Sequence, residues 1–172
     1  RRRRRNREKL RPELPLFSGT TGIAIFRGVA TGAALALLSG AYTAAVSWAL
    51  GPDSIDNQID FLRDMTDNPG AVALLIGIVT ILAPLCEEVF FRGAIFAAGR
   101  AAGVENAGIA ISAVLFATMH LIPLLFPFYV VFGVVMCKLY ARSGTLASPI
   151  AAHMTMNAMA CLSLLAQRNE IV

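Results

Sequence analysis

The feature that most constrains this chain is a long apolar run that ends in charged residues. Residues 71–86, AVALLIGIVTILAPLC, carry no charge, and Glu87, Glu88 and Arg92 follow almost at once. A helix needs about 20 mainly apolar residues to cross a membrane, and a charge inside the hydrocarbon costs about 2.5–3.5 kcal/mol. Charged side chains at this place are therefore expected to pair with one another or to serve a function.

The composition places the chain among membrane proteins. Hydrophobic residues make up 56% of its 172 residues and charged residues only 15%, whereas soluble domains have about 25% charged residues. This balance excludes an ordinary soluble enzyme and predicts one polytopic domain. Pro84 is expected to kink the helix that leads to the glutamates. Five apolar stretches predict an all-α transmembrane helix bundle with about five spanning helices, at 28–50, 71–99, 107–120, 121–137 and 146–166.

Charge is distributed unevenly along the chain. Eight of the fifteen basic residues lie within positions 1–11, so 1–19 is predicted to be a basic cytoplasmic segment that contacts anionic lipid and not nucleic acid. Residues 20–70 then hold the first spanning helix and an acidic loop. Apolar residues recur at helical spacing in this loop, over 51–70, which predicts a short amphipathic helix on the membrane surface. A solvated linker is the alternative.

Basic residues beside the spanning helices indicate the orientation. With the N-terminus in the cytoplasm, the acidic loop lies outside, whereas Arg100, Lys138 and Arg142 all lie on the inner side. We therefore expect an integral membrane protein, with a bacterial inner membrane favoured. The chain begins with arginine and not methionine, which favours a trimmed or processed chain. Residues 167–172 are expected to form a C-terminal tail.

Six polar residues stand out within or at the ends of the apolar helices. They are Glu87, Glu88, Arg92, His120, His153 and Asn157. Each is costly in lipid unless it meets another polar group, and together they come from three helices, so one shared polar pocket is the simplest prediction. Glu88 and Arg92 are four residues apart and can pair, whereas Glu87 points about 100° away from Glu88.

The distance of each residue from its nearest turn indicates its depth. Glu87 and His120 are equally far from the turn at 103–104, so they are expected to lie at one level. His153 is only about 8 residues past its own turn, roughly 12 Å at helical rise. Either the second helix bends early near Gly99, or the last helix is displaced.

These residue types suit hydrolysis of an amide bond. A glutamate with a histidine can hold and deprotonate a water molecule, and a second histidine with an asparagine amide can donate hydrogen bonds to an oxyanion. A metal ion held by Glu87, His120 and His153 is the alternative, although no H-E-x-x-H pattern marks a helical zinc site. The three cysteines match no metal or nucleophile pattern and are expected to be small core residues.

Three short motifs carry a resemblance to a known family. EEVFFR at 87–92 matches the family's EExxxR motif, FATMH at 116–120 its FxxxH motif, and HMTMN at 153–157 its HxxxN motif, in the same order. On these motifs the chain resembles the CPBP family, the CAAX proteases and bacteriocin-processing enzymes, also called Abi or Rce1-like. The resemblance covers about 70–165 and places a CPBP-like catalytic core at 71–166.

The resemblance implies an intramembrane endopeptidase of the glutamic type that needs no metal ion or other cofactor. Its substrate would be a peptide or protein at the membrane, prenylated or not. The matching positions are Glu87 for the general base, His120 for its partner in holding water, His153 and Asn157 for the oxyanion hole, and Glu88 and Arg92 for support.

Two other functions fit the same polar residues. A non-catalytic scaffold or bacteriocin-immunity protein would use the pocket only for binding. A small transporter or proton-coupled channel would use it as a relay, since carboxylates and histidines inside membranes also carry protons. The relay predicts flux across the membrane and no peptide products.

Overall fold

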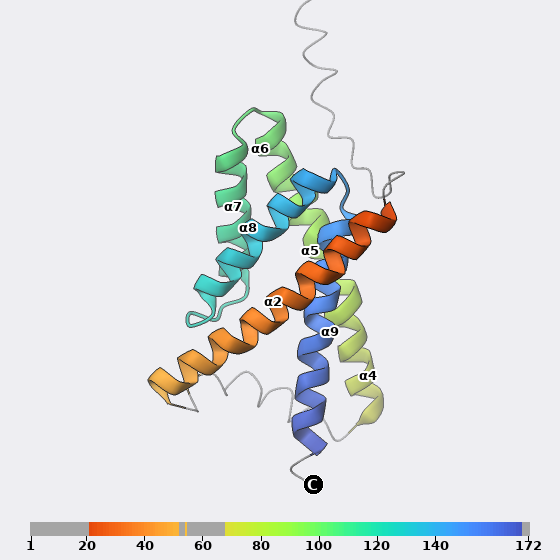
Figure 1. The fold of residues 1–172 in the computed structure, drawn as a ribbon, viewed down its shortest axis with the longest axis vertical. Coiled ribbons are helices and arrows are strands. Elements are labelled where there is room, and N and C mark those ends of the chain that lie inside the picture. Colours follow the sequence, from red (N-terminus) through yellow and green to blue (C-terminus); the bar gives the residue numbers. More distant parts are fainter. Residues whose placement is uncertain (1–20, 52–53, 55–67, 170–172) are drawn as a thin grey trace, which may run out of the picture.

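The described part of the chain folds into five helical rods. The computed structural model describes residues 21–51, 54 and 68–169, and within them every regular element is helical. The elements are α2 (Thr21–Leu50), α4 (Pro69–Gly77), η2 (Ile78–Leu82), α5 (Ala83–Glu88), η3 (Val89–Phe96), α6 (Ala97–Ala101), α7 (Glu105–Met119), α8 (Phe126–Ser143) and α9 (Ala147–Asn169). The segments from α4 to α6 follow one another without a break and form a single rod, called the kinked rod below (Figure 1). The predicted all-α bundle is confirmed.

Three helices in the described residues are long and apolar enough to cross a membrane. They span Thr21–Leu50, Gly70–Ala101 and Ala147–Ala166. The α7 helix is apolar but shorter, with 15 residues. The last four rods run in alternating directions along the bundle, and α2 crosses α9 at an angle (Figure 1). The chain therefore has the helices of an integral membrane protein.

The fourth helix differs from its predicted range at both ends. It begins at Phe126 because residues 121–125 form a turn-rich connection, and it continues to Ser143, beyond the predicted end. Pro127 lies in the first turn of α8, where a missing N–H costs nothing because that group has no partner inside the helix. Gly144 ends α8 in the left-handed conformation, with φ of 67°, which glycine adopts without strain.

Three predicted segments fall wholly or mainly outside the described residues. They are the basic segment 1–19, the amphipathic helix expected over 51–70, and the end of the C-terminal tail at 170–172. Their structure and roles stay predictions.

The α2 helix packs against α9 through two glycines. A Cβ atom added at Gly28 would collide with the carbonyl oxygen of Ser148, and one added at Gly32 would collide with the carbonyl oxygen of Ala152. The two helices therefore meet almost backbone to backbone, as small residues allow in membrane proteins. This contact places α2 along the helix that carries His153.

Gly32→Ala is expected to lower stability by about 1–3 kcal/mol, because the added methyl group has no room between the helices. Gly40→Ala on the same helix is the matched control, since nothing lies within 4 Å of a Cβ atom added there. The control is expected to be neutral or slightly stabilising, because alanine favours a helix over glycine by about 1 kcal/mol. Unfolding of both variants in detergent micelles is the measurement, and equal stabilities would contradict the close approach at Gly32.

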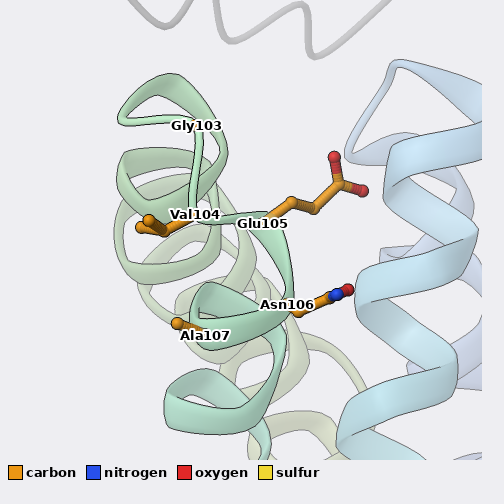
Figure 2. Close-up of a pocket in the computed structure, with 5 residues that line it drawn as sticks. All are labelled: Gly103, Val104, Glu105, Asn106 and Ala107. Atoms are coloured by element: carbon orange, nitrogen blue, oxygen red, sulfur yellow. The ribbon is translucent and has the colours of Figure 1, made fainter.

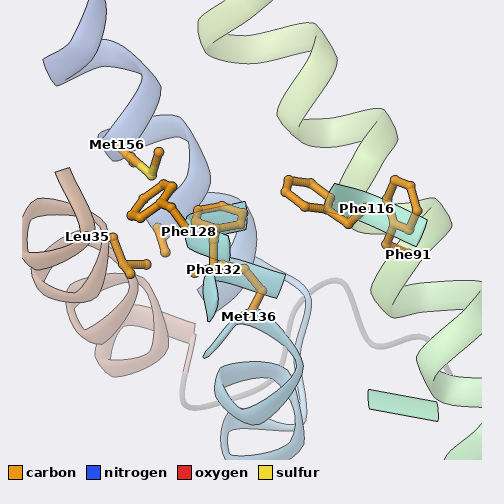
Figure 3. Packing of buried hydrophobic residues seen from close by; sticks show 8 residues of the cluster. Leu35, Phe91, Phe116, Phe128, Phe132, Met136 and Met156 are labelled. Atoms are coloured by element: carbon orange, nitrogen blue, oxygen red, sulfur yellow. The ribbon is translucent and has the colours of Figure 1, made fainter. Parts of the chain in front are cut away.

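Aromatic residues form the core between the rods. The Phe91 and Phe116 rings pack edge to face with centroids 5.3 Å apart, and Phe116 stacks on Phe132 at 5.1 Å. Figure 3 shows these rings together with Leu35 of α2 and Met156 of α9, which belong to the same cluster. The core therefore joins the kinked rod, α7 and α8 to the α2–α9 pair, and its rings lie beside the polar residues described next.

Candidate active site

The two glutamates lie on a short α-helical segment between two π-helical segments, η2 and η3. In η2, the Ala83 N–H donates to the Ile78 carbonyl, five residues back. Pro84 follows and has no N–H, so the regular ladder is interrupted there and the helix widens without breaking. In η3, the Ser112 hydroxyl donates to the Phe91 carbonyl at 2.9 Å and ties the rod to α7. Segments of π-helix occur often at functional sites.

Glu88 is the centre of a buried polar cluster. Its Oε1 accepts a hydrogen bond from Arg92 Nη1 at 2.9 Å and another from His153 Nδ1 at 2.9 Å. Glu88 and Arg92 are fully buried, and His153 is nearly so. The Glu88–Arg92 pair expected from their spacing is therefore present, and the bond to His153 joins the kinked rod to α9.

Arg92 is held by aromatic rings as well as by Glu88. Its guanidinium carbon lies 4.6 Å from the centroid of the Phe116 ring and 5.8 Å from that of Phe132. Its Nη2 donates a long hydrogen bond of 3.5 Å to the Gly133 carbonyl. The faces of aromatic rings attract cations, and the arginine in turn neutralises Glu88. The pair therefore adds no net charge to the site.

The bond to Glu88 determines which nitrogen of His153 faces Glu87. An ionised carboxylate only accepts hydrogen bonds, so His153 Nδ1 carries a hydrogen. Its Nε2 then lies 3.8 Å from Glu87 Oε2. The Glu87 side chain is 28% exposed, whereas its Oε2 is buried and has no hydrogen-bond partner among the described residues. Glu87 is therefore the more exposed carboxylate of the two, with one buried oxygen that lacks a partner.

His120 lies beside this cluster, directly after α7. Its Nδ1 is 2.8 Å from the Phe116 carbonyl oxygen, so Nδ1 donates to that oxygen and Nε2 is left as an acceptor. The imidazole ring contacts Phe116, with centroids 4.5 Å apart, and stacks on Tyr129 at 4.0 Å. It interacts electrostatically with both Glu87 and His153. His120 thus belongs to the same site and has a defined orientation.

Tyr129 is a site residue that none of the three motifs marks. It lies near the start of α8, where it stacks on His120 and interacts electrostatically with Glu87. Its ring limits the rotation of the imidazole. In the sequence, Tyr129 could have been recognised as a hydroxyl-bearing aromatic residue in the first turn of an apolar helix, shortly after the FATMH motif.

Asn157 lies one turn beyond His153 on α9. Its Nδ2 donates to the Val79 carbonyl in η2 at 2.9 Å. An amide nitrogen carries two hydrogens, so this contact uses only one of them. Four of the six candidates are linked to one another by hydrogen bonds or close charge contacts, namely Glu87, Glu88, Arg92 and His153. His120 lies next to these four residues. Asn157 binds the kinked rod about two turns before Glu87.

The depth of His153 follows from turns at different heights. The hairpin between α6 and α7 extends beyond the turn between α8 and α9 (Figure 1). Residues counted from these two turns therefore start at different levels. The kinked rod stays helical to Ala101, so displacement of the last helix, and not an early bend near Gly99, brings His153 to Glu87.

The α6–α7 hairpin holds a pocket that is separate from the six candidate residues. The pocket drawn in Figure 2 lies at the α6–α7 hairpin, is lined by residues 103–107, and includes none of the six candidates. In that hairpin Glu105 Oε2 lies 3.8 Å from Arg100 Nε, and both side chains are exposed. Within the part of the chain that the structure describes, no group of three or more His, Cys, Asp or Glu residues is arranged to hold a metal ion.

The segment from α4 into α9 matches a known family. A family model described as Type II CAAX prenyl endopeptidase Rce1-like covers residues 69–159, which is more than half of the chain. The chain belongs to this Rce1-like family. Comparison with curated proteins and with solved structures gave no match.

The Rce1-like segment contains all six candidate residues and Tyr129, and it agrees with the range of 70–165 expected from the motifs. The α2 helix lies outside it, although α2 packs directly on α9. Membership of the Rce1-like family makes the chain a membrane protein of the CAAX-protease type, which in general terms is an endopeptidase. The apolar helices agree with this assignment.

Proposed function

We propose that this Rce1-like protein hydrolyses a peptide bond near the membrane surface with a water molecule activated by Glu87 and His120, without a metal ion. The observation that carries the proposal is the contrast between two adjacent carboxylates. Glu88 is buried and neutralised by Arg92, whereas Glu87 is partly exposed and its buried Oε2 faces His153 without a hydrogen-bond partner. Titratable groups held in different environments are the usual basis of separate catalytic roles.

Glu87 is proposed as the general base. It takes a proton from water while the water oxygen attacks the peptide carbonyl carbon, and it then passes this proton to the leaving nitrogen as the C–N bond breaks. His120 orients the same water. Its Nδ1 is occupied by the Phe116 carbonyl, so its Nε2 is the atom that accepts a hydrogen bond from the water. One water is consumed, and a new carboxylate and a new amine are formed.

His153 and Asn157 are proposed as donors to the oxyanion that forms during attack. The Nδ1–H of His153 donates to Glu88 and so directs Nε2 toward Glu87, and Nε2 is a donor to the oxyanion whenever it carries a hydrogen. Asn157 has a second amide hydrogen besides the one that contacts Val79. Removal of one oxyanion donor costs about 10²–10³ in kcat in well-studied hydrolases.

The proposed substrate is a peptide or protein tethered at the membrane. The family description points to prenylated C-terminal segments as the first class to test. We further propose that the basic segment 1–19 lies in the cytoplasm and binds anionic lipid of a bacterial inner membrane. Nucleic acid and cofactors have no part in the proposal.

The test is cleavage of membrane-tethered peptides, prenylated and unprenylated, by the protein in liposomes, with products identified by mass spectrometry. Products are expected from at least one class, in amounts that a chelator does not change. Loss of products with chelator and recovery with added zinc would instead support a metal ion held by Glu87, His120 and His153. Binding of the peptides without any product would support the scaffold or immunity function.

A further inference from the structure

One carbonyl group of the kinked rod has lost its backbone donor. In η2 the Ala83 N–H donates to the Ile78 carbonyl, five residues back. The next bond in this series would run from residue 84 to the Val79 carbonyl, but Pro84 has no N–H. A carbonyl group without a partner is costly inside a membrane. The Val79 carbonyl therefore needs a donor from elsewhere in the fold.

Asn157 is that donor. Its Nδ2 lies 2.9 Å from the Val79 oxygen in a partly buried contact between residues 78 positions apart. A backbone defect created by one residue of the kinked rod is thus repaired by a side chain of α9. The His153 bond to Glu88 is a second attachment between the same two elements.

The two attachments together define how α9 sits on the kinked rod. The rod and α9 run in opposite directions (Figure 1), and Asn157 bonds before the glutamates while His153 bonds at them. A single hydrogen bond would leave the rotation of α9 against the rod to side-chain packing alone. Two attachments fix both its rotation and its position along the rod, and so fix where His153 Nε2 lies relative to Glu87.

We propose that Asn157 is a positioning residue whose amide replaces the N–H that Pro84 lacks, and that this bond keeps His153 opposite Glu87. The inference rests on the proposed function. It assigns the larger part of the contribution of Asn157 to the reaction rate to this bond, and the smaller part to direct contact with the oxyanion.

Restoring the missing N–H tests the proposal. Asn157→Leu removes the donor while keeping the branched shape of the side chain, and it is expected to lower kcat by about 10²-fold, the loss typical of slightly misplaced reacting groups. Pro84→Ala returns a backbone N–H to the rod and is expected to stay within about threefold of the wild-type rate. In the double variant the new backbone N–H can donate within the rod. Its kcat is expected to be at least about tenfold higher than that of Asn157→Leu, with KM unchanged. A double variant as slow as Asn157→Leu alone would overturn the proposal.

A second measurement does not depend on activity. In detergent micelles, Asn157→Leu is expected to lower the Tm of thermal unfolding strongly in the wild-type background and much less in the Pro84→Ala background. The reason is that substitutions affecting the same hydrogen-bonded group do not have additive effects on stability. Equal losses in the two backgrounds would refute the repair of the Val79 carbonyl. If the wild-type protein cleaves no peptide, the proposed function fails, whereas this coupling still decides the role of Asn157.

Thr155→Val is the matched control for both measurements. Thr155 lies on the same helix, and its hydroxyl donates to the Ala151 carbonyl within α9 at 2.7 Å, so this bond does not involve the kinked rod. Its loss is expected to have the same effect on the Tm in both backgrounds. If Pro84→Ala also reduced the loss of Tm caused by Thr155→Val, its effect would be a general stabilisation and the proposal would be wrong.

Discussion

Glu87→Gln is expected to lower kcat for peptide cleavage by about 10³-fold, because glutamine cannot take a proton from water. The substitution keeps the size of the side chain, so KM is expected to change little. Folding is expected to change little, since the side chain is partly exposed and its buried Oε2 accepts no hydrogen bond from the described residues. The variant therefore tests the role of Glu87 as a general base without disturbing the fold.

The measurement is the steady-state rate of product formation, with the Tm of each variant recorded in the same detergent. Glu105→Gln is the matched control, because Glu105 is an exposed carboxylate at the α6–α7 hairpin, and it is expected to keep the wild-type rate. A Glu87→Gln rate above about a tenth of wild type would mean that another group acts as the base.

Arg92→Met is expected to destabilise the folded protein by about 3–5 kcal/mol, the cost of leaving one partner of a buried ion pair alone. Glu88 is fully buried and receives its hydrogen bonds from Arg92 and His153. Without the arginine, only His153 remains to balance the charge of Glu88. Methionine fills most of the space, so the loss reports on charge more than on volume.

Denaturant unfolding in mixed micelles checks this prediction. Arg100→Met is the control, because Arg100 is exposed and lies 3.8 Å from an equally exposed glutamate, and surface pairs of this kind change stability by less than about 1 kcal/mol. If the two variants lost the same stability, the Glu88–Arg92 pair could not be the buried electrostatic anchor of the site. Activity is expected to fall together with the stability of Arg92→Met.

The features that followed from sequence are those determined locally. The length and polarity of an apolar stretch mark a membrane helix without knowledge of its neighbours. The pairing of Glu88 with Arg92 needs only the geometry of one helix, and the structure contains it. The start of α8 was misplaced because the apolar residues 121–125 suit a helix by composition, although the chain turns there and Leu121 adopts a positive φ of 54°.

The features that could not be predicted depend on contacts between distant segments. His153 bonds to Glu88 across 65 positions, and its depth depends on turns at different heights, which no count along one helix reveals. The stacking of Tyr129 on His120 requires the connection between α7 and α8 to fold back. The bond between Asn157 and Val79 joins residues 78 positions apart and involves a carbonyl in the π-helical segment ahead of Pro84.

The glycine contact between α2 and α9 has a consequence for the surrounding lipid. Helices that touch through their backbones cannot slide past one another by changing side-chain rotamers, so α2 and α9 tilt as one body. Membrane helices adjust to bilayer thickness mainly by tilting. His153 is part of this body, whereas Glu87 belongs to the kinked rod. The bonds of His153 to Glu88 and of Asn157 to Val79 hold the kinked rod to this body, so the spacing between Glu87 and His153 is expected to stay constant as bilayer thickness changes.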